Sequence, residues 1–135
     1  AFHLDSKIIL SEAVPQNELL KYLSGGDIGV HAISNTCLNH EYCLPNKLFE
    51  YIHAGLAVLC TNLKEMSHVV RENDIGLTFQ DKDPDDLASK MKHLIENTGE
   101  LQRYKLNSKN LSQSMTWEHE FTVLEQLYQE LLRGR

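Results

Sequence analysis

The chain has 135 residues, of which 41% are hydrophobic, and carries a formal net charge of −6. This length suits one globular domain with a core large enough to fold without disulfides or a structural metal. The negative charge disfavours non-specific binding to nucleic acid, which needs a basic face. Cys37, Cys43 and Cys60 follow no disulfide or metal-ligand spacing, which favours free thiols and a cytoplasmic location. No apolar run is long enough to span a membrane.

The first part of the chain alternates between apolar runs and helical patterns. Residues 7–14 (KIILSEAV) predict a strand that Pro15 ends. Residues 16–24 predict a short helix that stops at Gly25 and Gly26. Residues 27–33 (DIGVHAI) predict a second strand.

The same alternation continues after the polar stretch at residues 34–43 (SNTCLNHEYC). A helix is predicted over 45–54, and Gly55 closes it as a C-terminal glycine does. The chain then predicts a strand over 56–60, a helix over 64–73 and a strand over 75–80.

The last part of the chain is helical. Asp83 and Pro84 predict a helix start, because an acidic N-cap followed by proline favours one. One face of that helix carries Leu87, Met91, Leu94 and Ile95. A further helix is predicted near 100–112, and another after Trp117. The last helix carries apolar residues at spacings of three and four, which predict a core-facing stripe: Phe121, Leu124, Tyr128, Leu131 and Leu132.

Short apolar strands that alternate with helices indicate an α/β fold, with a Rossmann-like parallel sheet covered by helices on both faces. The pattern contains about four strands and then three consecutive helices, which is lopsided for such a fold. We therefore expect half of a doubly wound domain with a C-terminal helical tail.

The connection at residues 34–46 is the best candidate for a ligand site. Ligands of open parallel sheets bind beyond the carboxyl ends of the strands, and this connection is longer than usual. The helix that follows offers unpaired N–H groups and a positive dipole end, which together bind phosphate. Lys47 suits a phosphate oxygen, and Glu50 on the same face can accept two hydrogen bonds from a ribose diol.

A simpler interpretation of Lys47 and Glu50 stays open. The two residues can form an exposed ion pair that contributes a few tenths of a kcal/mol, with Glu50 favourably placed near the helix N-terminus. Composition and spacing do not separate this interpretation from an anion site.

The segment LPNKLFEYIHAGLAVLCTNLKEM, residues 44–66, closely resembles the donor-binding segment of GT-B fold glycosyltransferases of family 4, the glycosyl transferases group 1. Residues 14–30 resemble the helix and strand that precede it in that family. Residues 69–91 resemble the family's glycine-containing strand and the Asp-Pro helix after it. The resemblance covers most of the chain, and it is looser in the helical tail.

In that family two glutamates eight positions apart flank the donor loop. The resemblance implies that Glu50 is the second and binds the ribose hydroxyls of the nucleotide. Tyr42 stands where the first is expected, Glu41 is one residue out of register, and Leu44-Pro45 replaces the family's Phe-Gly. This departure leaves open which residue contacts the donor sugar. The pattern resembles a subclass common among bacterial enzymes of surface polysaccharide, including O-antigen.

The resemblance also implies roles for the first turn of the helix. Backbone N–H groups near Asn46 and Lys47 meet the pyrophosphate, and Lys47 neutralises it. Because the leaving group is a nucleoside diphosphate, these contacts strengthen as charge develops on it. The family generally works without a metal, so neither a metal nor another cofactor is expected. Glu65 matches another recurrent glutamate, and it either lines the donor pocket or favours the start of its helix.

The remaining candidates are less specific. None of the seven histidines has a metal-ligand spacing. His31, at the end of the second strand, and His40, in the long connection, either contact substrate or simply pack. Cys43 has no assignable base, which argues against a nucleophile. No residue is assignable as catalytic.

GT-B enzymes have two Rossmann-like domains with the active site between them. The resemblance implies that residues 1–135 are a partial C-terminal, nucleotide-sugar-binding domain, and that the acceptor domain is absent from this chain. The donor is then UDP-linked, from family frequency, or GDP-linked, and it is used for retaining transfer to a saccharide or a lipid-linked acceptor. We expect the chain to bind UDP or a UDP-sugar weakly and to transfer nothing alone.

Two alternatives were weighed against this interpretation, of which the second belongs to another class of protein. The chain can be a non-catalytic donor-binding subunit of a split glycosyltransferase. A response-regulator-like or flavodoxin-like domain of similar length is disfavoured, because a receiver needs paired acidic residues after its first strand and a lysine at a strand end, and the sequence has neither. Any association with the inner membrane would reside in the absent part of the enzyme.

Overall fold

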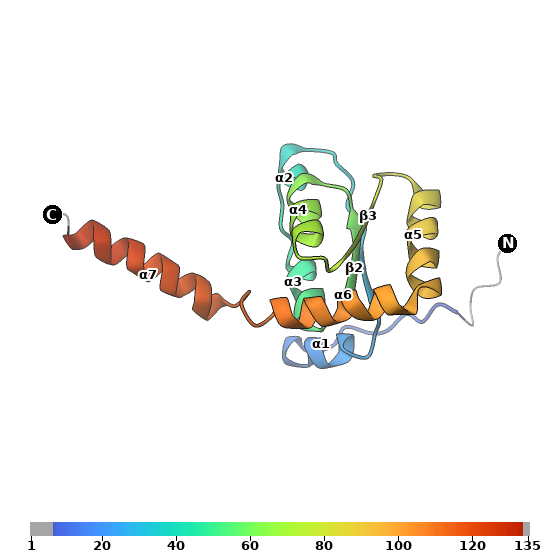
Figure 1. Ribbon diagram of the computed structural model, residues 1–135, viewed down its shortest axis with the longest axis horizontal. Coiled ribbons are helices and arrows are strands. Elements are labelled where there is room, and N and C mark those ends of the chain that lie inside the picture. The colour runs from blue at the N-terminus through green and yellow to red at the C-terminus, as the bar shows by residue number, and fades with distance from the viewer. Residues whose placement is uncertain (1–6, 134–135) are drawn as a thin grey trace.

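The computed structural model describes residues 7–133. It contains one parallel sheet with the strand order β1-β2-β3. Val30 pairs with Leu59, and Leu59 pairs with Leu77. Helices flank the sheet on both sides, which confirms the predicted α/β class (Figure 1). The strands are β1 (Ile28–His31), β2 (Ala57–Thr61) and β3 (Gly76–Phe79).

The helices follow the prediction closely, apart from one addition. The short helix α2 lies inside the polar stretch 34–43, where no helix was predicted. Figure 1 shows α3 and α4 on one side of the sheet and α5 on the other. The bounds are α1 (Gln16–Leu23), α2 (Leu38–Glu41), α3 (Asn46–His53), α4 (Lys64–Glu72), α5 (Pro84–Glu96), α6 (Thr98–Leu111) and α7 (Trp117–Arg133).

The strand predicted over residues 7–14 is wrong, so the described sheet has three strands and not four. Ile8, Ile9 and Leu10 are exposed, and Ile9 keeps 87% of its surface accessible. An apolar run becomes a strand only when a neighbouring strand accepts its backbone hydrogen bonds. Within residues 7–133, no strand pairs with this segment.

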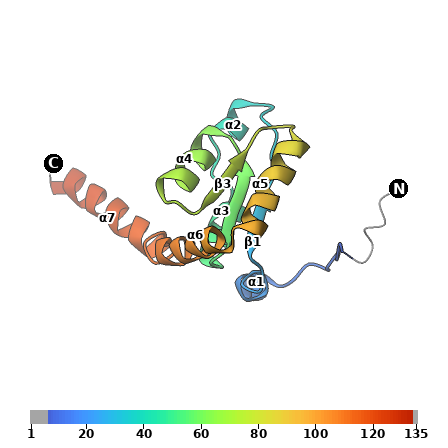
Figure 2. The ribbon, with the colours of Figure 1, turned by 45° about the vertical axis from the view of Figure 1, so that its right-hand side comes forward.

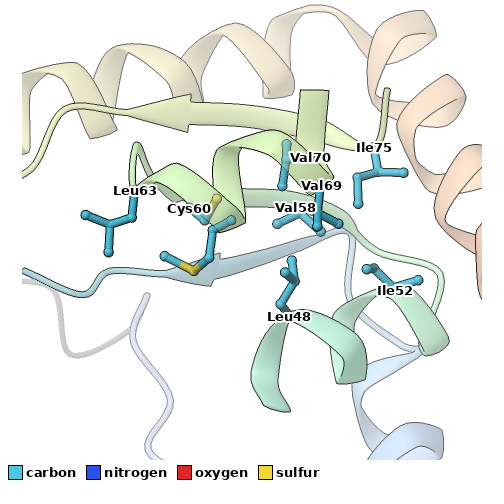
Figure 3. Packing of buried hydrophobic residues seen from close by; sticks show 9 residues of the cluster. Leu48, Ile52, Val58, Cys60, Leu63, Val69, Val70 and Ile75 are labelled. Atoms are coloured by element: carbon cyan, nitrogen blue, oxygen red, sulfur yellow. The ribbon is translucent and has the colours of Figure 1, made fainter. Parts of the chain in front are cut away.

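The core lies on both faces of β2, whose five residues are all buried. Burial on both faces explains why this strand is apolar throughout instead of alternating. One face packs against α3 and α4, and the other against α5 and α6. The first cluster, seen in Figure 3, contains Leu48, Ile52, Val58, Cys60, Leu63, Met66, Val69, Val70 and Ile75. The second contains Ala57, Leu94, Leu101 and Tyr104.

Two helix ends form as their local sequence predicts. Gly55 follows α3 with φ of 71°, a left-handed conformation that glycine adopts without strain. The Asp83 carboxylate caps α5 by accepting hydrogen bonds from the N–H groups of Asp85 and Asp86. Pro84 occupies the first helical position, where its missing N–H costs nothing.

The apolar stripe of α7 does not face the core, contrary to the prediction. Figures 1 and 2 both show α7 extending away from the sheet, and the helix has no buried residue. Phe121 and Leu131 are exposed, and so is Ile95 on α5. The helices α3 to α6 already cover both faces of the sheet, so no face is left for α7.

Candidate nucleotide-sugar site

The position of α3 is set by its contacts with β1. Leu48 and Ile52 are buried in the core, and the Tyr51 hydroxyl donates a hydrogen bond of 3.0 Å to the carbonyl of Val30. The Tyr51 ring covers Gly29 so closely that an added Cβ there would clash with it. Because α3 follows β1 in a parallel sheet, its amino end lies at the carboxyl edge of the sheet.

The amino end of α3 has free backbone donors. Pro45 is the N-cap residue, and no side chain caps the helix. The N–H of Leu48 bonds the carbonyl of Pro45 at 2.9 Å. The N–H groups of Asn46 and Lys47 have no acceptor among residues 7–133. These donors, together with the helix dipole, favour an anion at this end.

Lys47 and Glu50 do not form the ion pair of the simpler interpretation. Among the ion pairs of residues 7–133, none involves either side chain. Lys47 is exposed and Glu50 is half-buried. Both charges therefore remain available to a ligand.

A pocket of about 380 Å³ lies between α1 and α3, and Glu50 belongs to its wall. The apolar part of the wall suits a flat ring, and the polar part suits hydroxyl groups. That α1 contributes to this pocket was not predicted from the sequence. The lining residues are Gln16, Leu19, Leu20, Asn46, Phe49, Glu50 and His53.

The connection between β1 and α3 holds itself together by internal hydrogen bonds. Nδ1 of His40 lies 2.8 Å from the carbonyl oxygen of Ser34 and 3.0 Å from Oγ1 of Thr36. The Cys43 thiol donates to the carbonyl of His40 at 3.2 Å. A further bond, from the N–H of Asn35 to the Asp81 carboxylate, ties the connection to the end of β3. Both His40 and Cys43 are therefore committed to local structure.

The predicted residues before α3 lie outside the α1–α3 pocket. Glu41 ends α2 and is half-buried, whereas Tyr42 and Leu44 are exposed. The Tyr42 ring lies under the ammonium of Lys64, which is 4.6 Å from the ring centroid. This cation–π contact joins the connection to the start of α4.

Glu65 is also separate from that pocket. It lies in the first turn of α4, where its charge favours the helix dipole. It lines a different, open hollow along the outer face of α4, together with Lys64 and Arg71. The structure thus brings Asn46, Lys47 and Glu50 together on α3 and leaves Glu65 on another helix.

His31 is the last residue of β1. Its side chain lies on the α3 face of the sheet, because it is two residues from Gly29, whose α3 side is covered by the Tyr51 ring. Its Nε2 atom is buried and has no hydrogen-bond partner within residues 7–133. Burial and, secondarily, the positive charge of Lys47 lower the pKa of His31. The sequence did not decide whether His31 contacts substrate or only packs in the fold.

Residues 7–133 contain neither a metal-binding cluster nor a membrane-spanning helix. No group of three or more His, Cys, Asp or Glu side chains there is arranged to hold a metal ion. Within the same range, the helices are all too short or too polar to cross a bilayer.

The chain matches one family model, that of the Glycosyl transferases group 1, over residues 1–97. The match includes the three strands, α1 to α5 and the whole of the α1–α3 pocket. No curated protein and no solved structure matches the chain. With most of its length, including the sheet and the open end of α3, covered by that model, the chain belongs to the glycosyl transferases group 1.

Proposed function

We propose that residues 1–135 form a partial C-terminal domain of a GT-B glycosyltransferase and bind a nucleotide sugar, with the acceptor domain outside this chain. The observation that carries the proposal is the position of Glu50. Its carboxylate lines the α1–α3 pocket one turn from the uncapped amino end of α3, where Lys47 is unpaired among residues 7–133. In a nucleoside diphosphate the ribose diol and the phosphates follow one another in the same order as Glu50 and the amino end of α3.

Each part of the donor has a matching group. The diphosphate lies at the amino end of α3, where the N–H groups of Asn46 and Lys47 donate and the Lys47 ammonium adds a charge. The Glu50 carboxylate accepts hydrogen bonds from the ribose hydroxyls. The base lies in the α1–α3 pocket against Leu19 and Phe49.

The same groups assist the transfer step. Breaking the bond between the sugar and the diphosphate leaves an additional negative charge on the leaving group. Fixed donors and Lys47 interact more strongly with that charge than with the intact donor, so they lower the barrier and do not merely bind. Lys47 and the helix dipole supply the positive charge here, so we propose a metal-independent site with no other cofactor.

The finer assignment follows the resemblance. We propose a UDP-linked hexose or N-acetylhexosamine as the donor, with retaining transfer to a saccharide or lipid-linked acceptor in surface polysaccharide biosynthesis, O-antigen or capsule. The whole enzyme would act in the cytoplasm, at the face of the inner membrane. The 135-residue chain alone binds the donor but does not transfer the sugar.

An NMR titration of the 135-residue chain with UDP and with GDP tests the donor site. We expect the amide signals of residues 44–50 to shift, and Lys47→Ala to weaken binding about tenfold or more, as loss of a charged hydrogen bond does. Lys92→Ala is the matched control. Lys92 lies on the exposed side of α5, where its ammonium is 3.7 Å from the Glu96 carboxylate. Shifts confined to other residues would refute the site.

The role of Glu50 has its own test. Removing the ribose hydroxyls, as in a 2′,3′-dideoxy nucleoside diphosphate, should weaken binding to the natural chain. It should have no further effect on Glu50→Ala, because the partner of those hydroxyls is gone. Equal losses in both proteins would show that Glu50 does not bind the ribose.

A further inference from the structure

His31 and Lys47 lie at corresponding positions on β1 and α3. The Tyr51 hydroxyl is bonded to the carbonyl of Val30, which anchors α3 to β1 at that level. Lys47 is one helical turn before Tyr51, and His31 is the residue after Val30. Since α3 runs back along β1, both steps lead toward the carboxyl edge of the sheet. His31 and Lys47 therefore lie at the same edge of the sheet, close enough for the Lys47 charge to act on the His31 ring.

The His31 ring has an unusual environment for a packed histidine. Buried polar atoms in proteins nearly always have hydrogen-bond partners, but Nε2 of His31 has none within residues 7–133. The lowered pKa keeps the ring neutral at pH 7 in the free protein. In the free protein, the site therefore contains a neutral imidazole near the positive charge of Lys47.

The groups packed around His31 leave Lys47 as the charge that acts on it. From α3, the Tyr51 ring covers Gly29 on the same face of β1, and its hydroxyl is already bonded to the carbonyl of Val30. From β2, Cys60 is the register partner of His31, and burial raises the pKa of this thiol to about 12, so it is neutral. Glu50 lies on the side of α3 that faces α1. Burial is the larger cause of the lowered pKa of His31, and the positive charge of Lys47 adds to it.

We propose that His31 is the second cation of the donor site and that its imidazole takes up a proton when the donor's diphosphate binds at the amino end of α3. This inference rests on the proposed function. A diphosphate brings two negative charges beside the ring, which outweigh the single positive charge of Lys47. Burial still disfavours the charged ring, but the diphosphate raises the pKa of His31 relative to the free protein.

Proton uptake on binding makes donor affinity depend on pH. In the complex the pKa of His31 is higher than in the free protein, so affinity rises as pH falls through that higher value. The rise ends where the free protein also becomes protonated. A difference of one pKa unit between the two states corresponds to about a tenfold change in affinity.

The test uses the 135-residue chain and UDP-glucose, whose diphosphate is esterified at both ends and keeps its charge between pH 5.5 and 8. Ring C–H signals of the histidines are followed by NMR over this range, with and without UDP-glucose. We expect the His31 midpoint to move to higher pH in the complex and the affinity to rise about tenfold between pH 8 and pH 6. His31→Gln should abolish that rise, because glutamine cannot take up the proton.

His119→Gln is the matched control, because His119 lies on the exposed helix α7 and should leave the pH dependence unchanged. If UDP-glucose binds at α3 while His31 keeps its midpoint, the inference is overturned and the proposed function stands. If neither UDP-glucose nor GDP-mannose binds, both are overturned. The wild-type titration decides the matter even if His31→Gln fails to fold.

Discussion

The hydrogen bond from Tyr51 to the carbonyl of Val30 fixes the rotation of α3 about its own axis. With Tyr51 held over Gly29, the preceding turn directs Lys47 toward the end of β1, and Glu50 lines the pocket beside α1. Lys47 and Glu50 therefore lie on adjoining parts of the α3 surface. Stability of this junction should therefore respond to changes at β1 and at α3 alike.

Tyr51→Phe should lower the free energy of unfolding by about 1 kcal/mol, because the half-buried carbonyl of Val30 loses its partner while the ring remains. Urea unfolding followed by far-UV circular dichroism measures this loss. The matched control is Tyr22→Phe, whose hydroxyl bonds Ser11 in an exposed position and should matter by less than about 0.5 kcal/mol. Equal losses for the two variants would contradict the proposed junction.

Gly29→Ala should destabilise the fold by about 1–3 kcal/mol, because the added methyl group overlaps the Tyr51 ring. The ring cannot move away without giving up its bond to Val30. Gly99→Ala is the control, since a Cβ there meets no atom within 4 Å. It should leave stability unchanged or raise it by up to about 1 kcal/mol. Comparable losses in urea would show that α3 adjusts freely.

Asp83→Ala should cost about 1 kcal/mol of stability, because the N–H groups of Asp85 and Asp86 lose their acceptor. Asp83→Asn, which keeps an acceptor oxygen, should recover most of this loss. The thermal midpoint of each variant measures the effect. If Asp83→Asn is as unstable as Asp83→Ala, charge rather than capping explains the contribution of Asp83.

Stability should fall as pH rises from about 9 toward 12, since burial raises the pKa of Cys60 to about 12. In that range the unfolded chain releases the thiol proton while the folded chain keeps it, which favours unfolding. Burial and Glu100 likewise raise the pKa of Tyr104 to about 12, so it adds to the loss above pH 10. Urea midpoints between pH 8 and pH 10.5, under reducing conditions, measure the slope.

Cys60→Val should reduce this alkaline slope below pH 10, because the ionising group is removed and an apolar side chain remains. Cys37→Val is the comparison, since Cys37 is exposed. An unchanged slope in Cys60→Val would mean that the thiol ionises in the folded chain.

Removal of α7 should leave the free energy of unfolding of the sheet domain within about 0.5 kcal/mol of its original value, because α7 has no buried residue. The shortened chain ends at residue 116 and lacks the only tryptophan, so circular dichroism is the measurement. A loss of more than about 2 kcal/mol would mean that α7 packs on the domain in solution.

The sequence by itself determined the features that depend on neighbouring residues. The start of α5 at Asp83 and Pro84 and the end of α3 at Gly55 follow from the conformations that these residues prefer. The unbroken apolar run of β2 also predicted a buried strand, because a strand buried on both faces has no polar side. The motif at the start of α3 is likewise a property of the local sequence, and it resembles the family that the chain belongs to.

Tertiary structure alone decided which apolar surfaces find a partner. Residues 7–14 have a strand's composition, but within residues 7–133 no strand lies beside them to complete their hydrogen bonds. The apolar stripe of α7 stays exposed because other helices already cover the sheet. The approach of Gln16 to Glu50 and the alignment of His31 with Lys47 were equally hidden, since both depend on how α1 and α3 pack around β1. Local preferences act over a few residues, whereas burial depends on segments that meet only after folding.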